Sequence, residues 1–269
     1  MSWKIGLSTG ACIDRPIVDV LKAFRDVGAR GVELGTHPRH FDVTSPDEVA
    51  GVAACLRSLA LQPISIHAPF GGSLDLAHPD AAHRTAAVHA IKGAADALKH
   101  AGGTIVVVHP SDLARHGQDV SARLNDTVAS LASVAEFCRQ QSMTLAVESP
   151  LPHLIGGNPD EFRTILTRLD PAVKVCLDTG HTFLGGFWNQ FVDVSSGRLE
   201  HVHASDNLGV YDDHLPPGEG RIDWKHVVAT LERASFTGWV MLELHCLSND
   251  VTGYFAKAMQ SADVLRPCA

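Results

Sequence analysis

The sequence lacks the features of a secreted, membrane-spanning or disulfide-stabilised protein. Its first residues, Met-Ser-Trp-Lys-Ile-Gly-Leu, contain no basic segment followed by a long apolar run. No later segment approaches the ~18 uncharged apolar residues that a membrane helix needs. The six cysteines, at positions 12, 55, 138, 176, 246 and 268, show no paired spacing. We therefore expect reduced, mostly buried thiols and a cytoplasmic location.

Clusters of positive charge are also missing. The chain has 22 lysine and arginine residues against 30 acidic residues, a net charge of −8, and the basic residues form no run. Because neutralisation of phosphates supplies most of the non-specific affinity for nucleic acids, a nucleic-acid partner is disfavoured. We expect a small-molecule substrate and no membrane partner. A homo-oligomer is compatible with the sequence, which sets no number of subunits.

Low-complexity segments and linkers are absent as well. Hydrophobic residues make up 45% of the chain and charged residues 19%, so the chain can bury a sizeable core. At 269 residues it has the length at which α/β barrels fold as one unit. We predict a single domain that spans residues 1–269.

Short apolar runs rich in β-branched residues alternate with longer amphipathic stretches along the whole chain, which indicates repeated βα units. Eight runs are expected to be strands: Lys4–Ser8, Gly31–Leu34, Ile64–His67, Thr104–His109, Thr144–Glu148, Lys174–Asp178, Leu199–His203 and Trp239–Glu243. Eight evenly spaced units favour closure into a (β/α)8 TIM barrel over an open doubly wound sheet, which would usually have fewer strands.

Helix signals lie between several of these runs. Ser45-Pro46 and Asn158-Pro159 each place a capping residue before a proline, with acidic residues in the first turn. The alanine-rich stretch from Pro79 to His100 ends at Gly102-Gly103, as a helix that leads into a strand should.

Histidines and carboxylates stand where the apolar runs stop, and histidine is abundant, with 16 copies. In order these residues are His67, His109, Glu148, Asp178, His203 and Glu243. The carboxyl ends of parallel barrel strands converge at one mouth, so the six side chains should face one another. Crowded ionisable groups with few lysines or arginines nearby predict a divalent metal ion as the source of positive charge.

Two further segments extend this set. His181 follows Asp178 by three residues in Leu-Asp-Thr-Gly-His, so a turn can bring both side chains to one site. A loop rich in proline and glycine, after the seventh strand, carries two adjacent aspartates, Asp212 and Asp213, followed by His214.

As an ordered set, these motifs resemble the xylose-isomerase-like TIM-barrel superfamily, which contains sugar isomerases and epimerases and the endonuclease IV family. The resemblance spans nearly the whole chain. Its carriers are Ile-His-Ala-Pro (66–69), Val-His-Pro (108–110), Val-Glu-Ser (147–149), Leu-Asp-Thr-Gly-His (177–181), His-Val-His-Ala-Ser-Asp-Asn (201–207), His-Leu-Pro-Pro-Gly-Glu-Gly-Arg-Ile-Asp-Trp (214–224) and Leu-Glu-Leu (242–244).

The resemblance implies a metal site and leaves the number of ions open. In isomerases and epimerases, the residues that match Glu148, Asp178, His203 and Glu243 hold one divalent ion, often manganese. In the endonuclease branch, further ligands complete a three-zinc centre, and they match His67, His109, His181, Asp212 and His214. The resemblance also selects Asp212 over Asp213.

Two chemistries follow. As an isomerase or epimerase of a small sugar, ketose or polyol, the protein would use Glu148 and Glu243 as the acid/base pair around an enediolate. As a multinuclear zinc phosphoesterase, acting on apurinic sites or on a small phosphoester, it would use the additional ligands. His181 matches a position that contacts substrate in related epimerases. Other substrate-binding candidates are Glu219, Arg221, Phe70 and Trp188, and His245 is a further candidate for the pocket wall.

Two other interpretations are weaker. The segment Gly6-Leu7-Ser8-Thr9-Gly10 matches the G-x-S-x-G pattern of a serine hydrolase, but that elbow belongs after an inner strand of a sheet, whereas this one closes the first strand. A non-catalytic barrel that keeps a metal ion only for structure is also compatible, since fold alone does not determine function.

Overall fold

The computed structural model describes residues 3–266 and contains eight parallel strands that close into one barrel. Each strand pairs with its neighbours in chain order, and β1 also pairs with β8. The predicted TIM barrel is thus confirmed, and an open sheet is excluded. The strands are β1 (Lys4–Ser8), β2 (Gly31–Gly35), β3 (Gln62–His67), β4 (Ile105–Val108), β5 (Thr144–Glu148), β6 (Lys174–Asp178), β7 (Leu199–Ala204) and β8 (Trp239–Leu242).

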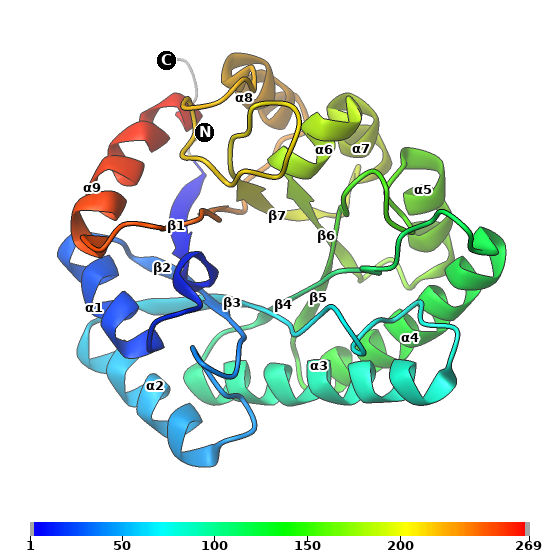
Figure 1. Ribbon diagram of the computed structural model, residues 1–269, viewed down its shortest axis with the longest axis horizontal. Helices are drawn as coiled ribbons and strands as arrows, with labels where there is room; N and C mark the ends of the chain where they lie inside the picture. Colours follow the sequence, from blue (N-terminus) through cyan, green and yellow to red (C-terminus); the bar gives the residue numbers. More distant parts are fainter. Residues whose placement is uncertain (1–2, 267–269) are drawn as a thin grey trace.

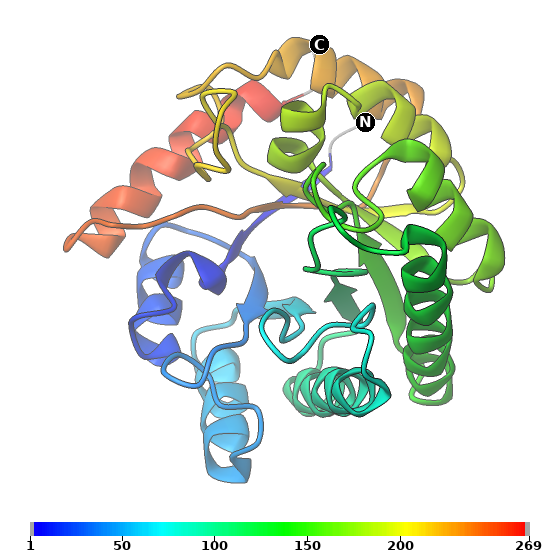
Figure 2. The same ribbon diagram turned by 45° about the vertical axis from the view of Figure 1, so that its right-hand side comes forward.

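Helices surround this barrel on its outside (Figures 1 and 2). The first and last helices lie side by side, with the rings of Phe24 and Phe255 edge to face at 4.7 Å, so the helical layer closes like the sheet within it. The helices are α1 (Ile17–Asp26), α2 (Pro46–Ser58), α3 (Ala81–Ala101), α4 (Val120–Gln140), α5 (Pro159–Arg168), α6 (Thr179–Gly185), α7 (Trp188–Val194), α8 (Trp224–Arg233) and α9 (Val251–Ser261), with 3₁₀ turns η1 (Thr9–Cys12) and η2 (Ala262–Leu265).

The apolar runs predicted the strands closely. β1, β5 and β6 begin and end at the predicted residues, and the ends of the other five strands differ by one or two residues. His109 and Glu243, which were expected to end their strands, lie just beyond β4 and β8. Parallel strands buried on both faces are apolar throughout, so the change to polar residues marks each strand end.

The helix signals also agree with the structure, with one correction. Ser45 and Asn158 cap α2 and α5 by accepting a hydrogen bond from the backbone three residues on. The α3 helix begins at Ala81 rather than at Pro79, because Asp80 is its cap and accepts from the backbone N–H of residue 82. It ends at Gly102, which has a φ of 98°.

Two glycines make room inside the barrel for large side chains of β8. A Cβ atom added at Gly31 would collide with the ring of Trp239, and one added at Gly6 would collide with the sulfur of Met241. Met241 belongs to a buried apolar cluster, and four of its members, Val107, Ala146, Cys176 and Met241, stand two residues before a polar strand end. Because alternate residues of a strand share a face, this cluster forms a dry layer beneath the mouth of the barrel.

Within residues 3–266, no helix is long and apolar enough to cross a membrane. The described cysteines form no disulfide, and Cys268 lies outside the described residues. The free thiols are those of Cys12, Cys55, Cys138, Cys176 and Cys246.

We predict that Gly31→Ala destabilises the protein by about 1–3 kcal/mol, because the new methyl group has to displace the Trp239 ring. Chemical denaturation followed by circular dichroism would measure the loss. Gly51→Ala in α2 is the matched control, because a Cβ atom there meets nothing within 4 Å. This control should stabilise its helix by roughly 0.5–1 kcal/mol. Equal stability of the two variants would contradict the prediction.

Candidate metal centre

All nine predicted metal ligands lie at one end of the barrel. Six stand at or next to the carboxyl ends of β3 to β8, and three lie on the segments that follow β6 and β7. They are His67, His109, Glu148, Asp178, His203 and Glu243, together with His181 in α6 and with Asp212 and His214 in the loop before α8. Their contacts divide them into three adjoining groups.

The first group joins two histidines to one carboxylate. The Nε2 atoms of His67 and His109 lie 3.2 Å and 3.1 Å from Glu148 Oε2. Neither contact has the geometry of a hydrogen bond, and this oxygen is buried without a hydrogen-bond partner among the described residues. Of these residues, His67 and Glu148 form with His203 a cluster whose ligand atoms lie within 4.8 Å of one another, and His109 adjoins it through Glu148.

The second group uses the other oxygen of Glu148. His203 Nδ1 lies 3.2 Å from Glu148 Oε1 and 3.0 Å from Glu243 Oε2. Asp178 completes the group, and its four ligand atoms all lie within 4.8 Å of one another. Asp178 Oδ1 accepts a 2.6 Å hydrogen bond from the backbone N–H of His181. Its Oδ2 is buried without a partner in residues 3–266, so it is the atom available to an ion.

The third group is centred on Asp212. Asp212 Oδ2 lies 3.1 Å from His181 Nε2 and 3.0 Å from His214 Nε2. The other oxygen, Oδ1, is buried and has no partner in the described part of the chain. His181 Nδ1 lies 3.8 Å from Glu148 Oε1, so the third group adjoins the second.

Backbone carbonyl groups determine which nitrogen of these imidazoles faces the centre. Nδ1 of His67, His181 and His214 lies 3.2, 2.9 and 2.9 Å from the carbonyl oxygens of Ala68, Ser149 and Glu243, respectively. A carbonyl oxygen only accepts, so Nδ1 carries the proton and Nε2 presents its lone pair to the centre. Histidines that bind metal ions almost always donate their second N–H in this way.

These observations fit divalent ions. The closest ligand atoms in the three groups are 3.0–3.2 Å apart. Tetrahedral ligands at ~2.1 Å from a zinc ion would be separated by about 3.4 Å. An unpaired buried acceptor costs about 1–3 kcal/mol, so cations would relieve Glu148, Asp178 and Asp212. The carboxylate-rich second group suits ions such as manganese, and the histidine-rich groups suit zinc.

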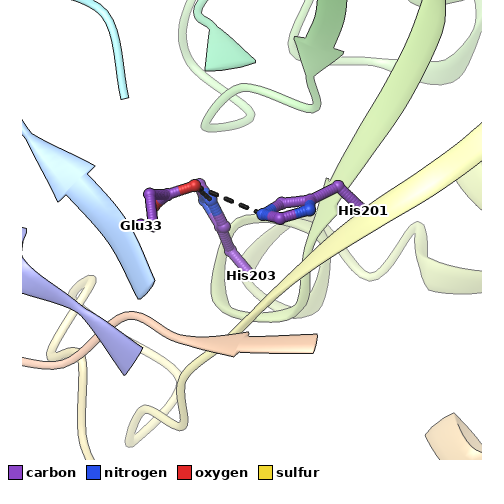
Figure 3. Close-up of side chains that lie close together, drawn as sticks. All are labelled: Glu33, His201 and His203. Atoms are coloured by element: carbon purple, nitrogen blue, oxygen red, sulfur yellow. Dashed lines mark hydrogen bonds and ion pairs between the residues drawn. The ribbon is translucent and has the colours of Figure 1, made fainter. Parts of the chain in front are cut away.

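Sequence reasoning missed two residues that hold His203 from below, Glu33 and His201. Glu33 Oε2 lies 3.0 Å from His203 Nε2 and 3.2 Å from His201 Nε2, and it accepts a 2.8 Å hydrogen bond from Ser65 Oγ. Figure 3 shows the carboxylate of Glu33, from β2, pointing toward both imidazoles of β7. With Nε2 donating to Glu33, the Nδ1 atom of His203 is left for the second group.

Glu33 and the two histidines are also close enough to hold an ion themselves. A neutral imidazole has only one nitrogen with a free lone pair, so His203 can bind an ion in this trio through Nε2 or an ion in the second group through Nδ1, but not both. Two signals could have identified the trio: a carboxylate inside the apolar strand Gly-Val-Glu-Leu-Gly, and the His-Val-His spacing that places both imidazoles on one face of β7.

A second buried carboxylate, Asp206, ties together the loop that carries Asp212 and His214. It accepts hydrogen bonds of 2.7–3.0 Å from the backbone N–H groups of Asn207, Gly218 and Ile222 and from the indole of Trp224. Its own backbone pairs with that of Leu215 through bonds of 2.7 Å and 2.8 Å. Asp206 therefore closes the neck of this loop and positions the third group.

Without an ion, the centre is a network of carboxylates and protonated imidazoles. Burial lowers the pKa of His67, but the adjacent Glu148 outweighs burial and raises it to about 9. The pKa of His214 is likewise lowered by burial and raised to about 9 by Asp212. Burial works to raise the pKa of Glu148, yet neighbouring imidazoles hold it well below its usual range. Metal binding would displace the protons of these imidazoles.

A cavity of about 550 Å³ opens beside the centre. Its wall includes His67, His214 and Glu243 of the predicted ligands, and also Phe70 and His245. The Phe70 ring stacks on the His109 imidazole, with centroids 4.2 Å apart and planes inclined by 11°. The structure thus places Phe70 and His245 where a bound substrate could contact them.

The other substrate-binding candidates lie elsewhere. Trp188 begins α7 and is buried in the hydrophobic core. Glu219 and Arg221 are exposed on the loop between β7 and α8, and neither lines the cavity. A role for these three residues in substrate binding stays a prediction that the cavity wall does not favour.

The serine-hydrolase interpretation finds no support in the local geometry. Ser8 is fully buried, and its Oγ accepts a hydrogen bond from the backbone N–H of Gly10, which caps η1. The nearby imidazole of His40 contacts Thr9 Oγ1 at 3.0 Å instead. The serine therefore serves the turn after β1.

The fold and the clustered ligands define a class, the TIM barrels with a candidate metal centre at the carboxyl mouth. Residues 21–268 match the family described as xylose isomerase-like TIM barrel, and the chain belongs to this family. The resemblance inferred from the motifs is therefore confirmed.

Several curated proteins are similar in sequence. An uncharacterized protein of Methanocaldococcus jannaschii is 28% identical over 189 residues, which cover 67% of this chain and 64% of that protein. The matches cover 58% and 54% of the next two uncharacterized relatives. Fructoselysine 3-epimerase of Escherichia coli is 22% identical over 277 residues, 98% of either chain. A probable endonuclease 4 of Halobacterium salinarum is 26% identical over 221 residues, 73% of this chain and 77% of that protein.

Solved structures of sugar epimerases share the fold. A D-tagatose 3-epimerase-like protein superposes with a TM-score of 0.84 at 21% identity, over 97% of this chain and 98% of that chain. L-ribulose 3-epimerase superposes with a TM-score of 0.81 at 16% identity, over 98% of this chain and 94% of that chain. At these identities the likeness concerns the architecture.

We predict that Glu33→Gln lowers metal affinity about 10–100-fold, since it weakens the bond that orients His203. Competition with a chromophoric chelator would measure the affinity. The control is Glu161→Gln, the same change at a buried carboxylate that pairs with Arg115 at 2.6 Å. An equal loss in both variants would show that the effect is general destabilisation.

A pH dependence follows from His67 and His214, whose pKa values are raised from 6.5 to about 9. Their stabilising contribution is complete below the unfolded-state pKa of about 6.5 and is lost as pH rises through about 9. The melting temperature of the metal-free protein should therefore fall between these pH values. The stabilisation by added zinc should grow over the same range, because the free imidazole is the ligand.

Differential scanning fluorimetry with and without a chelator would test this dependence. His67→Asn removes one of the histidines whose pKa is raised and should reduce the slope of the metal-free protein. A melting temperature that rises with pH in the absence of metal would contradict the assignment.

Proposed function

We propose that the protein is a divalent-metal-dependent isomerase or epimerase of a small sugar, ketose or polyol. The observation that carries this proposal is the pair Glu148 and Glu243, whose carboxylates come from opposite parts of the barrel and both contact His203 Nδ1. Glu243 also lines the cavity. Epimerisation requires proton carriers on two sides of one carbon, and this pair supplies them. The full-length similarity to fructoselysine 3-epimerase supports the proposal.

In this proposal, Glu148 and Glu243 transfer protons and the other residues of the second group hold the ion. Glu148 and Glu243 both have lowered pKa values despite burial, because histidines next to them favour the charged form. Either carboxylate can therefore take the proton from the carbon beside the substrate carbonyl. If the other glutamate is protonated when the substrate binds, it returns its own proton to the opposite face and inverts that carbon, and the two glutamates exchange proton and charge. If the first glutamate instead returns its proton to the former carbonyl carbon, while the hydroxyl proton of the first carbon passes to the former carbonyl oxygen, the carbonyl moves. The divalent ion held by the second group would supply the positive charge that stabilises the enediolate.

Two neighbours would shape the substrate end of this site. His181 stays a candidate for substrate contact, but its Nε2 lies 3.1 Å from Asp212 Oδ2 and its side chain does not line the cavity. Phe70, stacked on His109, covers the first group from the cavity side. An aromatic cover reduces the access of water and thereby strengthens charge interactions within the centre.

A second candidate is a multinuclear zinc phosphoesterase. Eight of the nine predicted ligands fall in clusters whose ligand atoms lie within 4.8 Å of one another, and His109 contacts Glu148; this favours the candidate, because one ion needs only the second group. The similarity to a probable endonuclease 4 points the same way. Against it, the residues that line the cavity include neither lysine nor arginine, and the net charge is −8. A nucleic-acid backbone would find little complementary charge there.

We predict that Glu148→Gln and Glu243→Gln each abolish the exchange of a substrate carbon-bound proton with solvent, since a neutral amide cannot take up a proton at neutral pH. The measurement is deuterium incorporation into D-tagatose, D-fructose or L-ribulose in D₂O, followed by NMR. Glu200→Gln, at a carboxylate on the amino-terminal part of β7, is the control that should retain exchange.

Metal content separates the two candidates. About one ion per chain, together with deuterium exchange, supports the isomerase or epimerase. About three zinc ions, together with cleavage of bis(p-nitrophenyl) phosphate or of an abasic-site duplex, would replace it with the phosphoesterase. Normal exchange in both glutamine variants would overturn the acid/base assignment.

A further inference from the structure

The cavity beside the metal centre is larger than a bare sugar requires. Its volume is about 550 Å³. A six-carbon sugar has twelve non-hydrogen atoms, which fill less than about 360 Å³ even at the ~30 Å³ that one water occupies in the liquid. The cavity runs from Glu243 and His214 past the loop between β2 and α2 to Ala90 and Gly93 of α3. Space for a further chemical group therefore continues outward from the proposed reaction site.

This outer arm is mostly apolar: its wall includes Phe41, Val43, Leu74, Ala90 and Gly93, and its polar members are His37, Asp42, Thr44 and His89. At its junction with the metal centre, the cavity wall includes Ile13 and Phe70, whose side chains are 43% and 49% exposed. Burying such exposed apolar side chains against a ligand is favourable, because it removes apolar surface from water.

The charges of the arm argue against an anionic group. No lysine or arginine lines the cavity, and Asp42 is the carboxylate on its wall away from the metal centre. Hydrogen bonds from the side chain and backbone of Thr44 lower the pKa of Asp42, so this carboxylate stays negative at neutral pH. A phosphate in the arm would meet this charge and no permanent cation, because the basic side chains on this part of the wall are the imidazoles of His37 and His89.

We propose that the outer arm binds an uncharged apolar group, aromatic or alkyl, attached to the sugar, so that the substrate is a sugar conjugate. The inference rests on the proposed function, because that function places the sugar itself at the metal centre. The apolar wall and the continuity of the arm with the centre select this occupant over a phosphate ester.

Three ketoses with the same sugar and different ends test the proposal on the metal-loaded protein. They are D-fructose, D-fructose 6-phosphate and 6-O-benzyl-D-fructose, with dissociation constants measured by titration calorimetry. Burial of the benzyl ring should tighten binding at least about tenfold relative to D-fructose. The phosphate should give no gain.

Gly93→Leu is the informative variant, because a Cβ atom at Gly93 meets nothing within 4 Å and the longer side chain would fill the arm. The ratio of the D-fructose and benzyl-fructose dissociation constants should fall toward one. Ala90→Leu, which fills the same arm, is the second variant should the first fail to fold. Gly51→Leu in α2, equally open and outside the cavity wall, is the matched control and should keep the wild-type ratio.

The outcomes separate this inference from the proposed function. Binding of D-fructose without a gain from the benzyl group, or with a gain from the phosphate, overturns the inference and leaves the proposed function standing. If no ketose binds, the proposed function fails, and benzyl alcohol alone tests the arm by saturation-transfer NMR. A signal in the wild type that Gly93→Leu removes supports the arm, and no signal in the wild type overturns it.

Discussion

The carboxylate of Glu148 is the group on which the rest of the site depends. It is fully buried, and its two oxygens contact three imidazoles on opposite sides, those of His67 and His109 through Oε2 and that of His203 through Oε1. A lone negative charge in a barrel interior would be strongly unfavourable, so the position is tenable only within a ring of cationic groups or metal ions. The orientation of the surrounding histidines follows from this demand.

Two layers of the barrel interior surround this charge: the ligands at the mouth and, beneath them, an apolar cluster next to Glu33. Below the ligands, the apolar cluster around Met241 excludes water, so charge interactions above it act in a medium of low dielectric. At the level of that cluster, the Glu33 carboxylate replaces apolar packing on one side and orients His203. The same geometry explains why Gly6 and Gly31 are needed: they admit the side chains that form the dry layer.

Most of the fold and the ligand set could be predicted because both depend on local pattern. Parallel strands buried on both faces show as apolar runs, and the polar residue that ends each run lies at the mouth by topology alone. Glu33 does not follow this rule, because it stands inside β2 rather than at its polar end, and its partner His203 is 170 residues away. Trp188 shows a second reason for a wrong expectation. An aromatic residue soon after a strand has the same sequence pattern whether it packs in the core, as Trp188 does, or contacts a ligand.

The hydrogen bonds of Asp206 fix the base of the long loop independently of the side chains at its tip. The hydrogen bonds of its carboxylate lie at the neck, whereas the exposed apolar residues Leu208, Val210 and Tyr211 lie at the tip. Substitutions of these exposed side chains would leave the neck intact, whereas an insertion there would displace Asp212, which directly follows Tyr211 and belongs to the third group. The barrel can therefore exchange the surface around its entrance during divergence, or in laboratory recombination, without rebuilding its chemistry.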